Sequence, residues 1–261
     1  MLSKLLKRDL KKNMRWMWIL FVGTIVLAAV TRGAKEIGEN IAFFKVVGIF
    51  FESVFYALAI NCIIQSFLRN FLNFHKSFYS DESYLTHTLP VTKNALINSK
   101  YLTAFIEIVA GFASVIVSIL IMYAGPNFTQ TLKLLLSTII TGEFSVALTL
   151  VGFVTLVIVE FLMFISIIDF SIIIGFRAKD RKILKTFLIT LGISFAAITV
   201  LFICLLIVLK VNGIKFTTTS LLLSSSAFMS VLVSAIVIYM AVAVLFYFLA
   251  KKEFKKGVNV D

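Results

Sequence analysis

The chain has 261 residues, of which 60% are hydrophobic, and a formal net charge of +12. Soluble domains average about 45–50% apolar residues, so this chain has too few polar residues to cover a soluble surface, and a soluble fold is excluded. Its basic residues cluster at the ends of hydrophobic runs, a pattern that indicates membrane topology and contact with anionic lipid headgroups, not nucleic acid.

Residues 1–15 are expected to form a basic amphipathic helix. Leu2, Leu5, Leu6 and Leu10 recur at helical spacing, and six Lys and Arg residues occupy the other face. Such a helix suits the surface of an anionic inner leaflet. A charged tail that only sets the topology explains the pattern equally well.

Six hydrophobic runs predict six transmembrane helices, because a spanning helix needs roughly 20 apolar residues. The runs cover residues 16–30, 43–68, 101–124, 144–176, 186–209 and 227–250. The first is short unless the preceding helix continues into it. Between the third and fourth runs, residues 125–143 have an apolar middle that suits an interfacial or re-entrant segment.

The distribution of basic residues predicts the orientation. With the N-terminus inside, 19 of the 25 Lys and Arg residues face the cytoplasm, and six face outward. The six are Arg32, Lys35, Lys45, Lys133, Lys210 and Lys215. The positive-inside rule therefore places both termini in the cytoplasm, which an even number of spans requires.

Residues 70–100 form the longest interior run with frequent polar and charged residues. The helix of the second span is predicted to continue past Arg69, because Phe67, Phe71, Phe74 and Phe78 recur at helical spacing as a stripe at the membrane surface. In the second half of the run, the helix is predicted to be interrupted.

A short helix is expected to start at Ser80, since acidic residues follow it and favour a first helical turn. Pro90 then breaks the backbone, and Thr92 can cap the helix that enters the third span. The segment thus presents a small exposed element to the cytoplasm. Tyr84 and Leu85 beside the acidic residues suit docking into a groove of a partner protein.

Four carboxylates fall within the spans: Glu52, Glu107, Glu160 and Asp169. A charged side chain inside a bilayer costs a few kcal/mol, so such residues usually face a bundle interior or water. No Lys or Arg lies deep in a span to pair with them. They are interpreted either as the lining of a translocation path for cationic or amphipathic cargo, or as protonated or hydrogen-bonded structural groups.

Motifs for other chemistry are missing from the sequence. There is no G-x-x-x-x-G-K-[ST] phosphate-binding loop and no H-E-x-x-H, C-x-x-C or G-x-S-x-G motif. His75 and His87 flank Asp81 and Glu82, but a surface role is favoured over a metal site. The two cysteines, Cys62 and Cys204, lie in apolar runs and are interpreted as core residues and not as a disulfide.

The segment SDESYLTHTLPVTKNALINSKYL resembles the first cytoplasmic loop of ABC-2 type transporter permeases. Small bacterial members of that family often have an acidic pair, Gly-Tyr-Leu, an apolar-Leu-Pro-Val turn and a Ser-Lys pair before the third span. The matching residues are Asp81, Glu82, Tyr84, Leu85, Thr88, Leu89, Pro90, Val91, Ser99 and Lys100, with Ser83 in place of the usual Gly.

The hydrophobic runs predict an all-α polytopic membrane protein, and the resemblance implies that residues 1–261 form a single transmembrane permease domain in the bacterial cell membrane. It implies a cytoplasmic coupling helix that seats in a separate ABC ATPase, through Ser80, Asp81, Glu82, Tyr84, Leu85, Leu89 and Pro90. It also implies a second permease chain. ATP and Mg would be bound by the ATPase, so this chain is expected to hold no cofactor and no metal, and to be no enzyme.

The function expected from this resemblance is export of a peptide, drug or amphipathic compound, driven by ATP hydrolysis in the partner subunit. The alternative is a non-transporting membrane protein, such as an immunity, sensing or assembly factor, that binds a partner through the same loop. An intramembrane enzyme is disfavoured, because the four carboxylates show no paired catalytic spacing.

Overall fold

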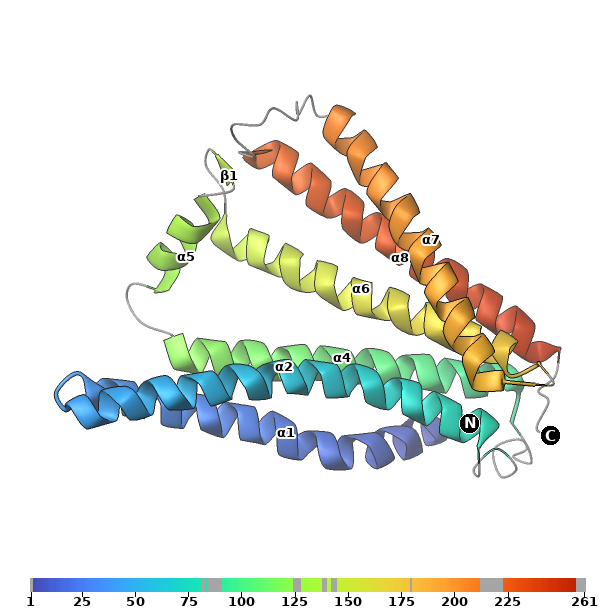
Figure 1. The fold of residues 1–261 in the computed structure, drawn as a ribbon, viewed down its shortest axis with the longest axis horizontal. Helices are drawn as coiled ribbons and strands as arrows, with labels where there is room; N and C mark the ends of the chain where they lie inside the picture. The colour runs from blue at the N-terminus through green and yellow to red at the C-terminus, as the bar shows by residue number, and fades with distance from the viewer. Residues whose placement is uncertain are drawn as a thin grey trace. The chain divides into compact units, whose positions relative to one another are not determined.

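A computed structural model describes residues 2–80, 83, 91–123, 128–137, 140–141, 145–178, 180–211 and 223–256. Six long helices dominate it (Figure 1): α1 (Leu2–Gly38), α2 (Ala42–Tyr79), α4 (Lys93–Tyr123), α6 (Val146–Gly175), α7 (Lys182–Val211) and α8 (Ser225–Lys255). All six are long and apolar enough to cross a membrane. The predicted all-α, six-span fold is therefore confirmed, and the chain is a multi-pass membrane protein.

The contacts between helices divide the chain into two compact units, Met1–Pro126 and Asn127–Asp261. The first contains α1, α2 and α4, and the second contains α6, α7 and α8. Each of these units has three spans, and the single transmembrane domain implied by the resemblance stays a prediction.

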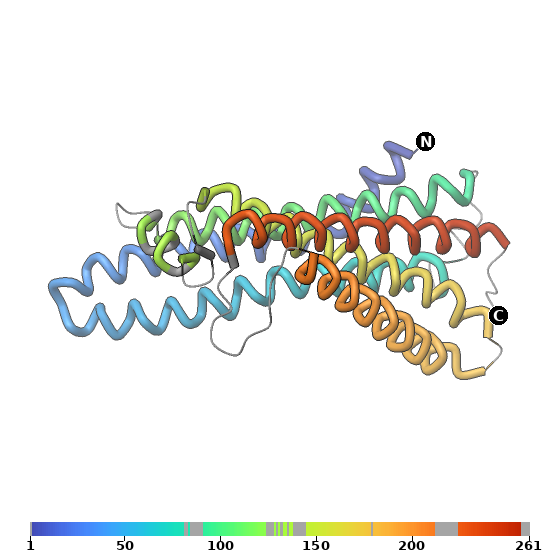
Figure 2. The backbone as a smooth tube through the Cα atoms, turned by 90° about the horizontal axis from the view of Figure 1, so that it is seen from above, coloured from blue at the N-terminus to red at the C-terminus, as the bar shows by residue number. Residues whose placement is uncertain are grey.

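In the first unit, α1 packs along both α2 and α4. Helices α1 and α2 form a hairpin whose tight turn is visible in Figure 2. Gly38 permits this turn, because a Cβ at that position would lie 2.8 Å from the backbone nitrogen of Lys45. The apolar core of the unit comes from all three helices and includes Met17, Phe21, Phe55, Cys62, Val115 and Met122.

Residues 2–15 are helical, as expected, but they form the first part of α1 instead of a separate surface helix. One face of this segment, with Leu5 and Asp9, is buried. The aromatic stripe on α2 also differs from its prediction. Phe74 and Phe78 are 2% and 0% exposed and stack edge to face with their ring centres 4.9 Å apart. These rings fill the interior of the unit and do not lie at a membrane surface.

The helices of the first unit are longer than a bilayer requires. Helix α2 has 38 residues, which corresponds to about 57 Å at 1.5 Å per residue, against a hydrocarbon core of about 30 Å. Its apolar run was predicted to end near Leu68, so the last turns extend roughly 16 Å beyond that run. The last turns of α2, up to Tyr79, therefore form an extension beyond its predicted apolar run.

In the second unit, α6 packs against both α8 and α7. Its core contains Met163, Ile167, Ala197, Leu201 and Ala243. Serine side chains cap two of the helices: Ser145 accepts a hydrogen bond from the Leu148 amide at the start of α6, and Ser224 accepts one from the Ala227 amide at the start of α8. Both caps satisfy amides that a helix leaves unpaired at its first turn.

The remaining elements of the second unit are short. Helix α5 (Phe128–Ser137) occupies the apolar middle of the predicted connection 125–143. Strands β1 (Ile140–Thr141) and β2 (Leu223–Ser224) form a two-residue parallel pair, with Ile140 opposite Leu223. This pairing links the segment before α6 to the segment before α8.

Candidate functional site

A line of buried polar side chains runs through the interior of the first unit, and we call it the polar seam. All its members are buried, although the helices around them are apolar enough to span a membrane. Buried polar groups in such helices usually mark functional sites or specific packing. The polar seam comprises Asp9, Asn13, Ser66, Asn70, Ser99, Thr103, Glu107 and Ser114.

An ion pair forms the first part of the polar seam and joins α1 to α4. The carboxylate of Asp9 lies 3.1 Å from the ammonium of Lys100, and the two side chains are 6% and 11% exposed. The hydroxyl of Ser99 also donates to Asp9, at 3.3 Å, and the guanidinium of Arg8 lies 3.6 Å away. Ser99 and Lys100 are the Ser-Lys pair of the ABC-2-like segment, so this motif anchors the start of α4.

Amide side chains form the next part. Asn73 of α2 donates to the side-chain oxygen of Asn13 on α1, at 2.5 Å. One turn away, the Asn70 amide donates to the backbone carbonyl of Ser66, at 2.6 Å. Hydrogen bonds between helices are worth about 0.6 kcal/mol on average in membrane proteins, so the contact between Asn73 and Asn13 adds specificity to an otherwise apolar bundle, whereas the bond of Asn70 lies within α2.

Glu107 is the least exposed of the four predicted carboxylates. It is 0% exposed, and neither of its carboxylate oxygens has a hydrogen-bond partner among the described residues. Asn13 and Asn70 are the side chains placed to donate hydrogen bonds to this carboxylate, and the charges of Arg69 and Lys100 also act on it. A buried polar group without a partner is rare in proteins and requires an explanation, such as bound water, an ion or a proton.

The helices beside Glu107 approach closely. One turn further along α4, a Cβ at Gly111 would lie 2.6 Å from the hydroxyl oxygen of Ser66 on α2. Small residues at such a crossing let helix backbones come together. This close approach of α2 and α4 lies one turn from Glu107.

Glu52 differs from the prediction that no basic residue pairs with the intramembrane carboxylates. Its carboxylate lies 2.8 Å from the ammonium of Lys35 at the end of α1. It also accepts hydrogen bonds from the hydroxyls of Tyr123 and Tyr56. The helical hairpin brings Lys35 back beside α2, and this fully partnered Glu52 fits the structural interpretation better than the translocation path.

The other two carboxylates lie in the second unit, both on α6. Asp169 is 3% exposed, whereas Glu160 is half-buried and faces Tyr239 of α8. At about 100° per residue, positions nine apart fall on opposite faces of a helix. The structure therefore does not bring Glu160 and Asp169 together.

Only part of the predicted coupling segment lies within the described residues. Asp81, Glu82, Tyr84, Leu85, Leu89 and Pro90 lie outside them. Helix α2 ends at Tyr79, and the Ser83 amide then donates to the Ser80 carbonyl at 2.7 Å. On the far side, Thr92 accepts a hydrogen bond from the Ala95 amide at 3.3 Å, which confirms the predicted helix cap.

The sequence analysis did not single out Asp9, Asn13 or Asn70. A signal for the first two was present, because the buried face of α1 recurs every three or four residues from Leu5 to Gly38, and Asp9 and Asn13 lie on it. A single acidic residue inside a basic, amphipathic segment, at a core position of the helical repeat, indicates a buried partner.

No group of three or more His, Cys, Asp or Glu side chains that can hold a metal ion occurs among the described residues. His87, Asp81 and Glu82 of the considered metal site are not among those residues. Comparison of the chain with protein-family models, with characterised proteins and with solved structures gives no match.

Proposed function

We propose that this chain is the membrane-spanning subunit of an ATP-driven ABC-2 type exporter in a bacterial cell membrane. A separate ATPase subunit would bind ATP and Mg, and a second permease chain would complete the transporter. The observation that carries the proposal is the ABC-2-like segment 80–100, which starts at the tip of α2 and returns through α4.

The packing around this segment supports a coupling role. A force on the α2–α4 connection would act on two helices that continue into the membrane-spanning part of the first unit. The start of α4 is also bound to α1 through Asp9, Ser99 and Lys100. Because these contacts are buried, a displacement of the connection would move α1, α2 and α4 together and not bend a single loop.

The direct test is the ATP hydrolysis rate of the chain with the ATPase that co-purifies with it. Alanine substitutions at the four central residues of the segment are expected to lower the stimulated rate at least tenfold while the protein stays folded. Those residues are Asp81, Glu82, Tyr84 and Leu85. Lys11→Gln is the control, since Lys11 is exposed on α1 and outside the segment. If the variant with all four substitutions stimulates ATP hydrolysis as strongly as the wild type, the segment has no coupling role.

Export itself needs a second measurement, a transport assay whose probes are chosen from the expected cargo class. Glu107 is the carboxylate expected to contact cationic or amphipathic cargo, because it is buried and, unlike Glu52, forms no ion pair among the described residues. In vesicles containing the complete complex, Glu107→Gln is expected to reduce uptake of cationic amphipathic probes severalfold. Glu52→Gln serves as the matched control, since Glu52 already pairs with Lys35.

One observation favours the alternative of a non-transporting partner protein. Glu160 and Asp169 lie on opposite faces of α6, and Glu52 is fully partnered, so three of the four carboxylates do not join a shared path within their own units. Such a protein would bind an ATPase or another partner through the same segment. Vesicles that hydrolyse ATP normally but accumulate no probe of any charge would support this second function.

A further inference from the structure

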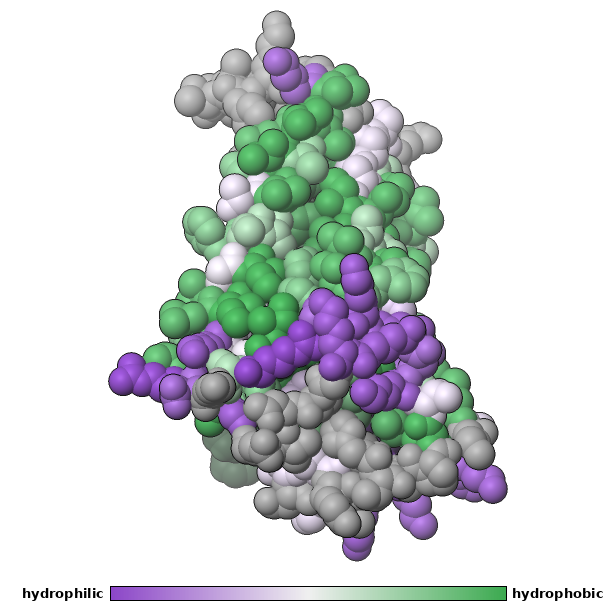
Figure 3. Space-filling view, turned by 90° about the vertical axis from the view of Figure 1, so that its right-hand side faces the viewer, coloured by the Kyte–Doolittle hydropathy of each residue, from purple (hydrophilic) through white to green (hydrophobic). Residues whose placement is uncertain are grey.

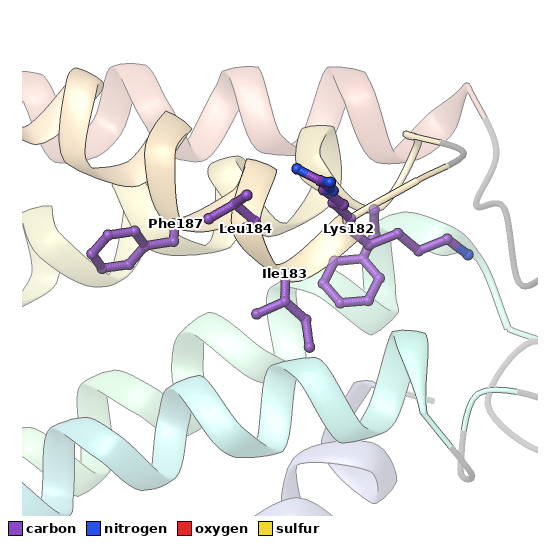
Figure 4. A pocket seen from close by; sticks show the side chains of 6 residues that line it. Lys182, Ile183, Leu184 and Phe187 are labelled. Carbon is purple, nitrogen blue, oxygen red and sulfur yellow. The ribbon is translucent and has the colours of Figure 1, made fainter.

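An open depression lies on the surface of the second unit, where α6 ends and α7 begins (Figure 4). It has a volume of about 700 Å³ and is lined by Phe176, Arg181, Lys182, Ile183, Leu184 and Phe187. Four of these side chains are apolar and two are cationic. The lining surface is almost entirely apolar, so Arg181 and Lys182 contribute mainly non-polar atoms to it, and their charges belong to its rim.

The turn between the two helices builds this depression. Helices α6 and α7 touch at Gly175, where a Cβ would lie 2.7 Å from the Cα of Thr186. This crossing leaves the residues on either side of Thr186 turned outward. Ile183 is 75% exposed and Phe187 is 62% exposed, and Figure 4 shows both projecting from the first turns of α7.

Positive charge lies at one end of the apolar floor, where Arg181 and Lys182 lie at the start of α7. The first turn of α7 has no acidic residue, and Arg181 forms no ion pair with any residue in the described part of the chain. The nearby Arg177 differs, since Glu253 of α8 neutralises it. Asp180 is the one acidic neighbour in the turn, and it is exposed.

The apolar floor continues along α7, because Leu188, Leu191 and Phe195 are 57%, 56% and 72% exposed. In Figure 3, which looks onto the end of the molecule where α6 ends, hydrophilic side chains cluster beside an apolar surface. A soluble anion would use only the cationic rim. An amphiphile with an anionic head would cover both surfaces.

We propose that this depression binds an anionic phospholipid. Its phosphate lies at Arg181 and Lys182, and an acyl chain follows Ile183, Leu184 and Phe187. Basic pockets between transmembrane helices are typical sites for anionic lipid headgroups. The proposal rests on the membrane location of the chain and does not depend on an export function.

The test measures lipid retention by the purified full-length chain in native mass spectrometry, with phosphatidylglycerol and phosphatidylcholine of identical acyl chains. The wild type is expected to retain phosphatidylglycerol preferentially. Each basic residue near an anionic lipid contributes a factor of about five. The double variant Arg181→Gln/Lys182→Gln is therefore expected to lower the preference about 25-fold, and Lys11→Gln is expected to leave it unchanged.

A second pair of variants tests the acyl-chain contact. Phe187→Ala is expected to reduce retention of phosphatidylglycerol severalfold, whereas Phe202→Ala, an exposed aromatic further along the same helix and outside the apolar floor, is expected to have little effect. Equal retention of the two lipids by the wild type would overturn the proposal. So would full competition by inorganic phosphate, which would make the site one for a soluble anion, or a preference that survives in the double variant.

Discussion

The buried ion pair between Asp9 and Lys100 provides the sharpest test of the first unit. It joins the N-terminal part of α1 to the start of α4 across a distance of 3.1 Å, with side chains only 6% and 11% exposed. We consider Asp9→Leu, Lys100→Met and the double variant. Each replacement is apolar and of comparable size, so it removes the charge without opening a large cavity.

The expected losses are unequal. Removing one partner of a buried ion pair typically costs about 3–5 kcal/mol. Asp9→Leu leaves Lys100 buried with Arg8 and Lys12 as its charged neighbours, so we expect a loss of about 4 kcal/mol. Lys100→Met leaves Asp9 with Ser99 and the partly exposed Arg8, which lowers the expected loss to about 2 kcal/mol.

The double variant is expected to lie within about 1 kcal/mol of the wild type, because two apolar residues can replace a buried pair with little net cost. Independent effects would total about 6 kcal/mol, so the coupling energy is expected to be about 5 kcal/mol. The assay is unfolding of the purified chain by SDS in mixed micelles. The exposed pair of Arg32 and Glu36 is the control, and Glu36→Gln is expected to change stability by less than about 0.5 kcal/mol. Additive losses at Asp9 and Lys100 would refute the pairing.

Two other expectations concern helix packing and the polar seam. Gly175→Ala is expected to destabilise the chain by about 1–3 kcal/mol, because the added methyl group would meet the backbone of Thr186. The matched control Gly192→Ala places its methyl group in open space and is expected to stabilise α7 by about 0.5–1 kcal/mol. Equal shifts in melting temperature for the two variants would argue against the α6–α7 crossing. Glu107→Gln is expected to raise the free energy of unfolding by about 1 kcal/mol, because an amide cannot carry a buried charge. A decrease of similar size in the free energy of unfolding, measured in the same SDS assay, would show that the carboxylate has a stabilising partner.

Much of the helical organisation was predictable from local sequence. The six spans follow from the lengths of apolar runs, since the bilayer thickness sets the length of a spanning helix. The extension of α2 beyond Arg69 followed from the spacing of its phenylalanines, and the cap at Thr92 from the hydroxyl before the helix. Each of these features depends on residues within a few turns of one another.

The site residues were less predictable. Glu107 was identified as a buried carboxylate, but its neighbours Asn13 and Asn70 come from two other helices. Lys35 was assigned to an outer segment, yet the turn after α1 places it beside Glu52. Asp9 and Lys100 are separated by most of the first unit in sequence, so only packing shows that they meet.

The sequence alone determined which segments are long and apolar enough to span a membrane, because water and hydrocarbon select different side chains along each helix axis. It did not determine which face of each helix is buried. Lipid chains are as apolar as a protein interior, so hydropathy does not distinguish Phe78, which is fully buried, from Phe195, which is 72% exposed. That choice, and with it the polar seam and the depression at the start of α7, was decided by tertiary packing.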